Sequence, residues 1–294
     1  MKQIFFLLLA LGLFSCSRQN EKITVLQNRI DSLQNKLQWY QSSEHLSQAL
    51  LWFQHSPEMH ALYVQGYNTA KQALACNLKN KQYKEKKNAV VVDIDETILN
   101  NGLYDGWLYF SGKAYSDSSW NAWGQDAIAE PLPGTVDFLN FAKDLGCEVF
   151  YVSNRKQNPL FEPTLQNLKK FNLPFADEKH LLLKTDTDKT PAGKTTKEKR
   201  RLRIENELNY EILLLCGDQM ADFDDAFDII SGGTEEQIKD SINTYKEKFG
   251  SRFIILPNPV YCDWLDQIVK GGDRNNSVAH LDSLRKAKVE RWKN

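Results

Sequence analysis

Apolar residues recur along the chain with two different periods. Residues 43–83 show helical spacing, and Ser56-Pro57 marks a break and a new helix start. Five short apolar runs of strand type follow, at residues 89–94, 148–152, 180–183, 212–216 and 253–256. Helical patterns lie between most of these runs, at residues 135–145, 159–171, 197–209 and 235–249. The body of the protein is therefore predicted to alternate strands and helices.

The five apolar runs are continuous rather than alternating, which is typical of strands that are buried on both faces. Strands that alternate with helices form a parallel sheet with right-handed crossovers. The predicted fold class is therefore α/β, with a Rossmann-like parallel sheet sandwiched by helices. We place this domain at residues 43–274.

Residues 100–133 fit neither period. They carry several aromatic side chains among polar residues, namely Trp107, Tyr109, Phe110, Tyr115, Trp120 and Trp123. A long aromatic connection directly after a strand indicates a cap or a binding loop. Together with residues 43–86, this segment is predicted to form a small helical and aromatic cap.

The amino terminus has the pattern of an export signal. Lys2 is followed by an apolar run from Ile4 to Phe14, which is shorter than the roughly 20 residues of a membrane-spanning helix. The run ends in Leu13-Phe14-Ser15-Cys16, which resembles a bacterial lipobox. That resemblance implies that residues 1–15 are a lipoprotein signal peptide and that a lipidated Cys16 anchors the chain to the cell envelope. By the same resemblance, Ser17 after the cysteine implies attachment to the outer membrane. The alternatives to a lipoprotein signal are an ordinary signal peptide with an incidental Cys and a buried core helix.

Residues 16–42 are predicted to be a tether between the anchor and the body. Its apolar positions step by three and four in a short heptad pattern, namely Ile23, Leu26, Ile30, Leu33, Leu37 and Tyr40. This segment is either a polar spacer helix or a stalk that forms a homodimer. At the other end of the chain, residues 275–294 are basic and are predicted to form a peripheral helix.

The overall charge limits the classes of partner. Lys and Arg total 37 against 38 for Asp and Glu, which gives a net charge of −1. A protein that binds a nucleic-acid polymer by bulk charge is strongly basic, so that class is excluded. Five Cys in 294 residues do not make a disulfide scaffold, and any pairing among Cys76, Cys147, Cys216 and Cys262 is left open.

Candidate chemistry is concentrated where the predicted strands end. Asp93 and Asp95 end the first strand, Ser153, Asn154 and Arg155 end the second, and Asp218 and Asp222 follow the fourth. In an open parallel sheet, ligands bind at the carboxyl ends of the strands. Carboxylates gathered there suit Mg²⁺, which takes one or two carboxylates together with substrate phosphate.

These residues resemble the haloacid-dehalogenase (HAD) superfamily. Its four motifs are matched in order by Asp93-Ile94-Asp95-Glu96-Thr97, Ser153, Lys197 and Gly217-Asp218-Gln219-Met220-Ala221-Asp222. The segments DIDETILNN (93–101), YVSNR (151–155), GDQMADF (217–223) and LPNPVY (256–261) are similar to the class C bacterial acid phosphatases, which include lipoprotein 5′-nucleotidases. Lys194 and Lys199 compete with Lys197 for the third motif.

The resemblance implies a Mg²⁺-dependent phosphomonoesterase with an aspartyl-phosphate intermediate. Asp93 is the implied nucleophile, and Asp95 the implied general acid and base. The implied metal ligands are the Asp93 carboxylate, the Asp95 backbone carbonyl and Asp218, with Asp222 orienting a bound water or supporting Lys197. Ser153 and Lys197 are expected to hold the phosphoryl oxygens.

The implied substrate is a small phosphomonoester, with nucleoside monophosphates favoured by the aromatic segment. Trp120 and Tyr261 match positions where the class C enzymes stack a nucleobase, although both could instead be packing residues of the cap. Asn154 and Arg155 are expected at the substrate, and Arg155 could instead pair with a carboxylate. Two other functions stay open, a HAD sugar phosphatase or phosphotransferase and a non-catalytic surface-binding lipoprotein on the same fold.

Overall fold

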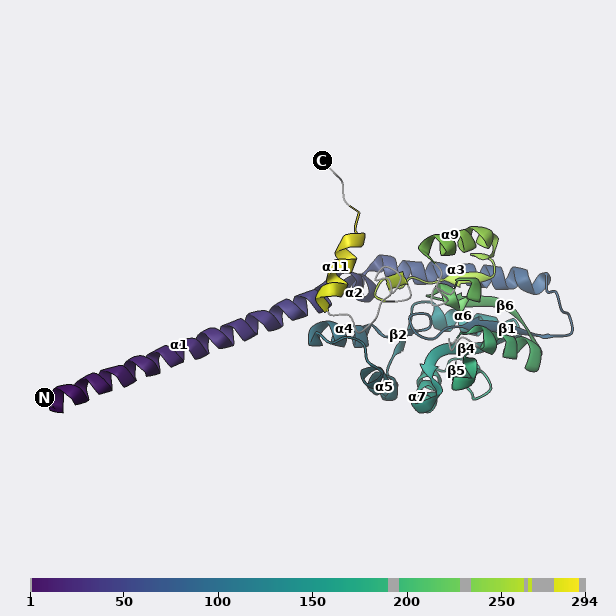
Figure 1. Ribbon diagram of the computed structural model, residues 1–294. Helices are drawn as coiled ribbons and strands as arrows, with labels where there is room; N and C mark the ends of the chain where they lie inside the picture. The colour runs from purple at the N-terminus through teal and green to yellow at the C-terminus, as the bar shows by residue number, and fades with distance from the viewer. Residues whose placement is uncertain (1, 190–195, 228–233, 262–263, 266–277, 291–294) are drawn as a thin grey trace.

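A five-stranded parallel sheet forms the centre of the protein in the computed structural model, which describes residues 2–189, 196–227, 234–261, 264–265 and 278–290 (Figure 1). The strands lie in the order β5-β4-β1-β6-β7, and all four neighbouring pairs are parallel. Their bounds are β1 Lys87–Val92, β4 Cys147–Lys156, β5 Leu181–Lys184, β6 Tyr210–Gly217 and β7 Phe253–Ile255. Two short strands, β2 Leu99–Asn100 and β3 Glu130–Pro131, form a separate antiparallel pair.

Helices connect these strands and extend the chain at both ends. The α-helices are α1 Lys2–Ser43, α2 Ser47–His55, α3 Pro57–Lys79, α4 Gly102–Ser111, α5 Asp117–Asp126, α6 Thr135–Asp144, α7 Gln157–Lys170, α8 Glu198–Leu202, α9 Glu235–Thr244 and α11 Val278–Lys288. Shorter 3-10 turns lie at Glu44–Leu46, Asp186–Asp188, Met220–Asp222, Asp225–Phe227 and Lys246–Lys248, and a π-helical turn lies at Arg203–Glu207.

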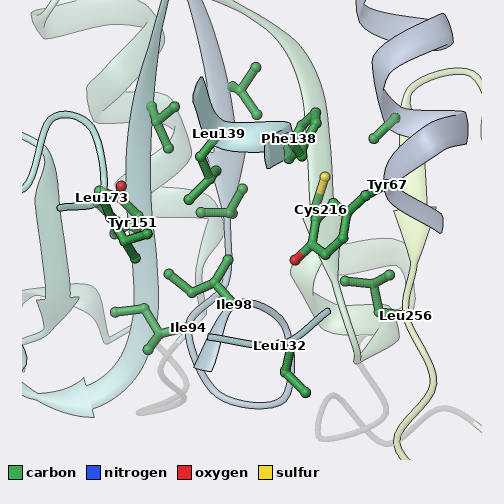
Figure 2. Close-up of a cluster of buried hydrophobic side chains, with 14 of the residues drawn as sticks. Tyr67, Ile94, Ile98, Leu132, Phe138, Leu139, Tyr151, Leu173, Cys216 and Leu256 are labelled. Atoms are coloured by element: carbon green, nitrogen blue, oxygen red, sulfur yellow. The ribbon is translucent and has the colours of Figure 1, made fainter. Parts of the chain in front are cut away.

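The sheet is buried on both faces, as the continuous apolar runs predict. Val90 and Val92 of β1 face a core that α3, α6 and α7 complete, and Figure 2 shows part of this cluster around Phe138 and Tyr151. Ala89 and Val91 face the opposite core, which includes Ile204 and a group of Phe side chains. Successive side chains of a strand point to opposite faces, so β1 supplies both cores from one run of residues. This arrangement confirms the predicted three-layer α/β fold.

Two predicted segments differ in detail from the structure. The helix expected over residues 197–209 is a short α8 that continues into the π-helical turn at Arg203–Glu207. Residues 100–133, which fit neither period, contain α4 and α5 and reach β3. Their aromatic rings pack mainly on one another, so the apolar contacts of this segment follow ring-to-ring packing rather than a helical stripe.

The amino-terminal segment is one continuous helix, α1, that extends away from the body (Figure 1). Trp39 fixes its inner end, because the indole Nε1 donates to the Tyr109 carbonyl at 2.8 Å. The tail helix α11 packs near the same junction, where burial and then the Arg285 guanidinium lower the pKa of His45 to about 4. Among the described residues, no helix is both long and apolar enough to cross a membrane.

Cys76, Cys147 and Cys216 are free thiols. Cys147 and Cys216 are buried in β4 and β6, whereas Cys76 of α3 is exposed. Burial raises the pKa of the Cys147 thiol to about 11, so this group stays protonated and inert at neutral pH. Cys262 lies outside the described residues.

A charged cluster closes the end of the sheet where the strands begin. Glu148 Oε2 accepts hydrogen bonds from Lys179 Nζ at 2.7 Å and Tyr210 Oη at 2.5 Å, and His180 Nε2 lies 2.7 Å away. Burial by itself raises the pKa of Glu148, but the bonds from Lys179, Tyr210 and His180 outweigh it and lower the pKa to about 2. The folded state therefore binds this proton more weakly than the unfolded chain does.

We expect Glu148→Gln to lower the free energy of unfolding by about 1–2 kcal/mol at pH 7, because charge-assisted hydrogen bonds to a partly exposed carboxylate are lost. The folded pKa lies below the unfolded value of 4.5, so the contribution of Glu148 is complete above pH 4.5 and disappears as the pH falls toward 2. Denaturant unfolding of both proteins between pH 7 and pH 3 measures the difference. The exposed Glu130→Gln variant is the control, and a gap between wild type and Glu148→Gln that does not narrow in acid would contradict the assignment.

Candidate active site

The loop that follows β1 carries the first motif, and two tyrosines of α3 form hydrogen bonds to its backbone. Tyr63 Oη donates to the Glu96 carbonyl at 2.5 Å, and Tyr67 Oη donates to the Thr97 carbonyl at 2.6 Å. Glu96 has a φ of 51°, a left-handed conformation that is uncommon for a residue with a Cβ. These buried tyrosines supply the hydrogen bonds that compensate for the strained turn, so α3 positions the two residues that follow Asp95.

Lys197 joins the first motif to the fourth. Its Nζ contacts Asp93 Oδ1 and lies 2.6 Å from Asp222 Oδ1, and all three side chains are buried. Burial lowers the pKa of Lys197, but Asp222 and Asp93 outweigh it and raise that pKa, so the ammonium form is held in place. Lys199 instead donates to the Thr187 and Lys189 carbonyls, and Lys194 lies outside the described residues. Of the three candidate lysines, Lys197 is the one that the structure places at Asp93.

Three buried carboxylates meet beside Lys197. The ligand atoms of Asp93, Asp218 and Asp222 all lie within 4.8 Å of one another, and we call these residues the carboxylate cluster. Three carboxylates and one ammonium carry a combined charge of −2, which a divalent cation balances. Asn258 Nδ2 donates to Asp218 Oδ2 at 2.9 Å and fixes the orientation of that carboxylate. Hard oxygen ligands of this kind fit a divalent metal.

Electrostatics at Asp93 support the same conclusion. Burial raises the pKa of Asp93 well above its usual range, Lys197 opposes this, and the carboxylates of Asp222, Asp218 and Asp95 raise it further. A nucleophilic carboxylate has to be ionised. A cation in the carboxylate cluster favours that ionised form, so the site is suited to work with a metal bound.

The close packing of Gly217 against Asp222 explains why glycine precedes the acidic motif. A Cβ added at Gly217 would lie 2.2 Å from Asp222 Oδ2 and 2.4 Å from Asp222 Cβ. Asp222 folds back over this glycine because its Oδ2 also accepts a hydrogen bond from the Gln219 amide at 3.0 Å. That turn leaves Oδ1 free to contact Lys197.

We expect Gly217→Ala to displace Asp222 from Lys197, to lower activity and to destabilise the fold by about 1–3 kcal/mol, the usual range for overpacking. Gly106→Ala is a matched control, because the nearest atom to its added Cβ is Gln54 Nε2 at 3.5 Å. Denaturant unfolding and phosphate release would be measured on both variants. Equal behaviour of the two variants would contradict the packing argument.

The Asp95 side chain is held by two residues of β4 and by Asn101. Arg155 donates to Asp95 Oδ1 from Nε at 3.0 Å and from Nη2 at 2.8 Å, and Ser153 Oγ donates to Oδ2 at 3.3 Å. Asn101 Nδ2 adds a bond to Oδ1 at 2.9 Å. Arg155 thus forms the carboxylate pair that sequence analysis left open, while Asp95 and Ser153 lie together as the motif order predicts.

Glu96 is a buried acidic residue of the site that sequence analysis quoted only as part of a motif. Its carboxylate accepts hydrogen bonds from the Asn101 backbone N–H at 2.7 Å and from the Asn101 side-chain Nδ2 at 3.1 Å. The Tyr261 hydroxyl donates to the same carboxylate. Burial, with Asp105 and Asp95 nearby, raises the pKa of Glu96. Tyr261 therefore reaches the motif loop through its hydroxyl, with its ring partly buried against the core.

Trp120 of α5 lies over the site from the cap. The Arg155 guanidinium lies 5.6 Å from the centre of the Trp120 ring, and Tyr104 meets the same ring edge-on at 5.1 Å. Trp123 Nε1 donates to Asn101 Oδ1 at 2.7 Å, which links the cap to the Asp95 network. The aromatic segment thus borders the carboxyl ends of β1 and β4, as a cap is expected to.

Two arginines just after Lys197 contact the carboxyl end of β4 and the Asp222 backbone. Arg200 donates to the Ser153 carbonyl at 2.5 Å and to Asn154 Oδ1 at 2.8 Å, whereas Arg201 donates to the Asp222 carbonyl at 2.9 Å. Asn154, an expected substrate contact, is exposed and is held by Arg200. Both arginines are buried, which is unusual for this residue type without partners.

Four residues that support the site were not predicted in that role, namely Glu96, Asn101, Arg200 and Asn258. Three of them had a signal in the chain, because Glu96 and Asn101 stand inside DIDETILNN and Asn258 inside LPNPVY. Arg200 lies in a run of basic residues that resembles a solvated surface helix. Its burial depends on β4, which is distant in sequence.

The fold and site define a phosphate-handling α/β enzyme of the HAD type, with a carboxylate cluster at the carboxyl ends of parallel strands. Residues 13–264 match the family model described as HAD superfamily, subfamily IIIB (acid phosphatase). The chain therefore belongs to this family of phosphoric monoester hydrolases. Phosphatases of this superfamily require a divalent metal, for which the carboxylate cluster is the candidate site.

Solved structures and curated relatives agree with this assignment. The class C acid phosphatase from Bacillus anthracis is 34% identical, with a TM-score of 0.77 over 86% of this chain and 100% of that one. A second structure of the same enzyme, with tungstate bound, has a TM-score of 0.76 at the same identity and coverage. Acid phosphatase 1 from Solanum lycopersicum is 26% identical over 132 residues, which is 45% of this chain. The chain spans 50% of the length of that tomato protein.

Proposed function

We propose that this protein is an exported, lipid-anchored phosphomonoesterase that uses Mg²⁺ and hydrolyses nucleoside monophosphates. The observation that carries the proposal is the contact of Lys197 with both Asp93 and Asp222, beside Asp218. It joins a nucleophile, a cation for the phosphoryl group and metal-binding carboxylates at one end of the sheet. Phosphate monoesters hydrolyse very slowly without catalysis, so the activation barrier of this reaction is high. Charges positioned in this way can lower that barrier.

The proposed reaction has two steps. Asp93 forms a bond to phosphorus while the bond to the alcohol oxygen breaks, and Asp95 gives its proton to that oxygen. Asp95 then takes a proton from water, which attacks the aspartyl-phosphate and releases inorganic phosphate and a free Asp93. Arg155, Ser153 and Asn101 support this role, because their contacts keep the Asp95 carboxyl group in one orientation between the two steps.

A bound metal would be held by the carboxylates of Asp93 and Asp218 and the backbone carbonyl of Asp95. When bound, Mg²⁺ reduces the repulsion between a carboxylate and a phosphate dianion. Lys197 adds a fixed positive charge from the chain itself, and the Ser153 hydroxyl offers a hydrogen bond to a phosphoryl oxygen. Asp222 keeps Lys197 in place through the contact at 2.6 Å.

The preference for nucleotides is proposed from the cap. Trp120 offers a flat apolar surface next to Arg155, and the nearby rings of Tyr104 and Tyr115 limit its movement. Every nucleobase has a π-face that can stack on such a ring, whereas a sugar phosphate has none. The aromatic cap therefore favours nucleoside monophosphates over sugar phosphates.

Phosphate release from a panel of nucleoside monophosphates and sugar phosphates, with and without EDTA, tests the proposal. We expect release from the nucleotides that EDTA abolishes and that Mg²⁺ restores. Release from sugar phosphates alone would favour a HAD sugar phosphatase, and phosphate transfer to an added alcohol would indicate a phosphotransferase. Binding without release would indicate a surface-binding lipoprotein.

We expect Trp120→Ala to raise KM for a nucleoside monophosphate by about 5- to 150-fold, since stacking on an aromatic ring is worth about 1–3 kcal/mol per base. KM for p-nitrophenyl phosphate, which carries no base, is expected to change little. Steady-state kinetics with both substrates measures the difference. Trp107→Ala is the matched control, because this exposed tryptophan of α4 also packs on Tyr104 but does not contact Arg155 in the described structure. Equal changes for both substrates would contradict a stacking role.

The proposed anchor is tested separately from catalysis. Cys16 lies within α1, in a part of the helix whose side chains the structure does not describe. A multiply acylated cysteine gives stable membrane attachment, because each buried CH₂ contributes about 0.8 kcal/mol. We expect labelled fatty acid to be incorporated into the wild-type chain but not into Cys16→Ser, with the phosphatase activity of both retained.

A further inference from the structure

A row of apolar side chains on α1 is open to solvent from Ile23 to Tyr40. Each of its members is between 46% and 59% exposed, a large fraction for an apolar side chain on a helix. The row, called the apolar stripe, consists of Ile23, Leu26, Ile30, Leu33, Leu37 and Tyr40. The helix extends away from the body, so the body does not cover the stripe in the described structure (Figure 1). An exposed apolar row of this length marks a surface for another molecule.

We propose that the apolar stripes of two copies pack together as a parallel, two-stranded coiled coil. The stripe repeats every seven residues, with Ile23, Ile30 and Leu37 at one position of the heptad, a, and Leu26, Leu33 and Tyr40 at the other, d. The first two heptads have isoleucine at a and leucine at d, a combination that favours two strands over three or four. The occupant of the stripe is therefore a second copy of this chain.

The residues that flank the apolar stripe favour the parallel arrangement. The g positions, on one side, are all cationic, namely Lys22, Arg29 and Lys36, whereas the e positions on the other side are the amides Asn20, Gln27 and Gln34. In a parallel pair, each g side chain faces an e side chain of the partner copy. An antiparallel pair would instead place g opposite g, so that cation faces cation along the interface. Like charges in such pairs are destabilising, which disfavours the antiparallel pair.

Contacts at the inner end of α1 leave the apolar stripe available. Trp39 lies at position c of the heptad, off the stripe, and packs edge-on against Tyr109 with ring centres 5.4 Å apart. This contact fixes the helix to the body through a different face. The part of the helix between Cys16 and Tyr40, at about 1.5 Å per residue, spans about 36 Å. A parallel pair therefore places both amino termini at one end and both catalytic bodies at the other.

Disulfide trapping tests the pairing and its direction on the full chain. In a parallel pair, Leu26 faces Leu26 of the second copy, whereas in an antiparallel pair centred on the stripe it faces Leu37. We expect full-length Leu26→Cys, expressed in cells and mildly oxidised, to form a disulfide-linked dimer on a non-reducing gel. Val25→Cys is the control, because Val25 is exposed to a similar extent but lies at c, off the stripe. Crosslinking only in a mixture of Leu26→Cys and Leu37→Cys would overturn the parallel arrangement.

The molar mass of the purified full chain in mild detergent gives a second test. Light scattering is expected to report twice the chain mass for the wild type and for Val25→Asp, and a single chain mass for Leu26→Asp. All three proteins are expected to release phosphate at the same rate per chain, which shows that the body is folded. Equal masses for the three proteins would overturn the proposal, because the apolar stripe would then not determine the oligomeric state.

Discussion

Replacement of Asp93 by Asn is expected to reduce kcat by about 10⁴-fold or more, as the removal of a catalytic nucleophile does in other hydrolases. The amide has nearly the shape of the carboxylate but cannot form the aspartyl-phosphate. It also removes the carboxylate that contacts Lys197. Phosphate release from a nucleoside monophosphate, with Mg²⁺ present, measures the loss.

Asp137→Asn is a matched control for this experiment. Asp137 pairs with Lys71 on the surface and its side chain is 77% exposed, so the pair contributes little to stability. The control is expected to keep wild-type activity, and thermal unfolding of both variants shows whether each is folded. Substantial phosphatase activity in purified Asp93→Asn would refute the nucleophile assignment and, with it, the proposed mechanism.

Replacement of Asp95 by Asn is expected to reduce kcat for a nucleoside monophosphate by about 10²- to 10⁴-fold, the usual contribution of general acid–base catalysis. The leaving alkoxide needs a proton, and the amide cannot supply it. With p-nitrophenyl phosphate the leaving group departs without a proton, so Asp93 can still be phosphorylated. Hydrolysis of that intermediate then lacks its base.

Rapid kinetics separates these two steps. We expect Asp95→Asn to release one equivalent of p-nitrophenol in a burst, followed by slow turnover, and to show no burst with the nucleotide. Such a burst is the kinetic sign that a covalent intermediate accumulates. A uniform loss for both substrates without a burst would mean that Asp95 acts through the structure of the loop, where it contacts Arg155 and Asn101.

Comparison of the predicted and observed elements shows which parts of the fold follow from local sequence patterns. The five strands were predicted because burial on both faces demands a continuous apolar run, and a run is a local property. The irregular helical turn after α8 was not predicted, since residues 197–209 have an ordinary helical pattern. The aromatic cap could be recognised as a separate segment, but its two helices were obscured because the rings pack on one another.

The site also contains residues that could be predicted from the sequence and residues that could not. Asp93 and Asp218 follow β1 and β6, and because these strands are neighbours, their carboxyl ends meet. Lys197 stands 104 residues after Asp93, and its choice over Lys194 and Lys199 could not be made from spacing. Arg200 stands in a basic run of the chain for which no role was predicted, and it is buried against β4.

The amino-acid sequence by itself determined the parallel α/β architecture, the order of the motifs and the heptad pattern of the tether. Each of these depends on residues that are close along the chain and on one repeating period. The tertiary structure alone decided that Lys197 meets Asp93, that Arg155 pairs with Asp95 and that Tyr261 reaches Glu96. These contacts depend on the sheet order β5-β4-β1-β6-β7, which brings distant strand ends together and which no local period encodes.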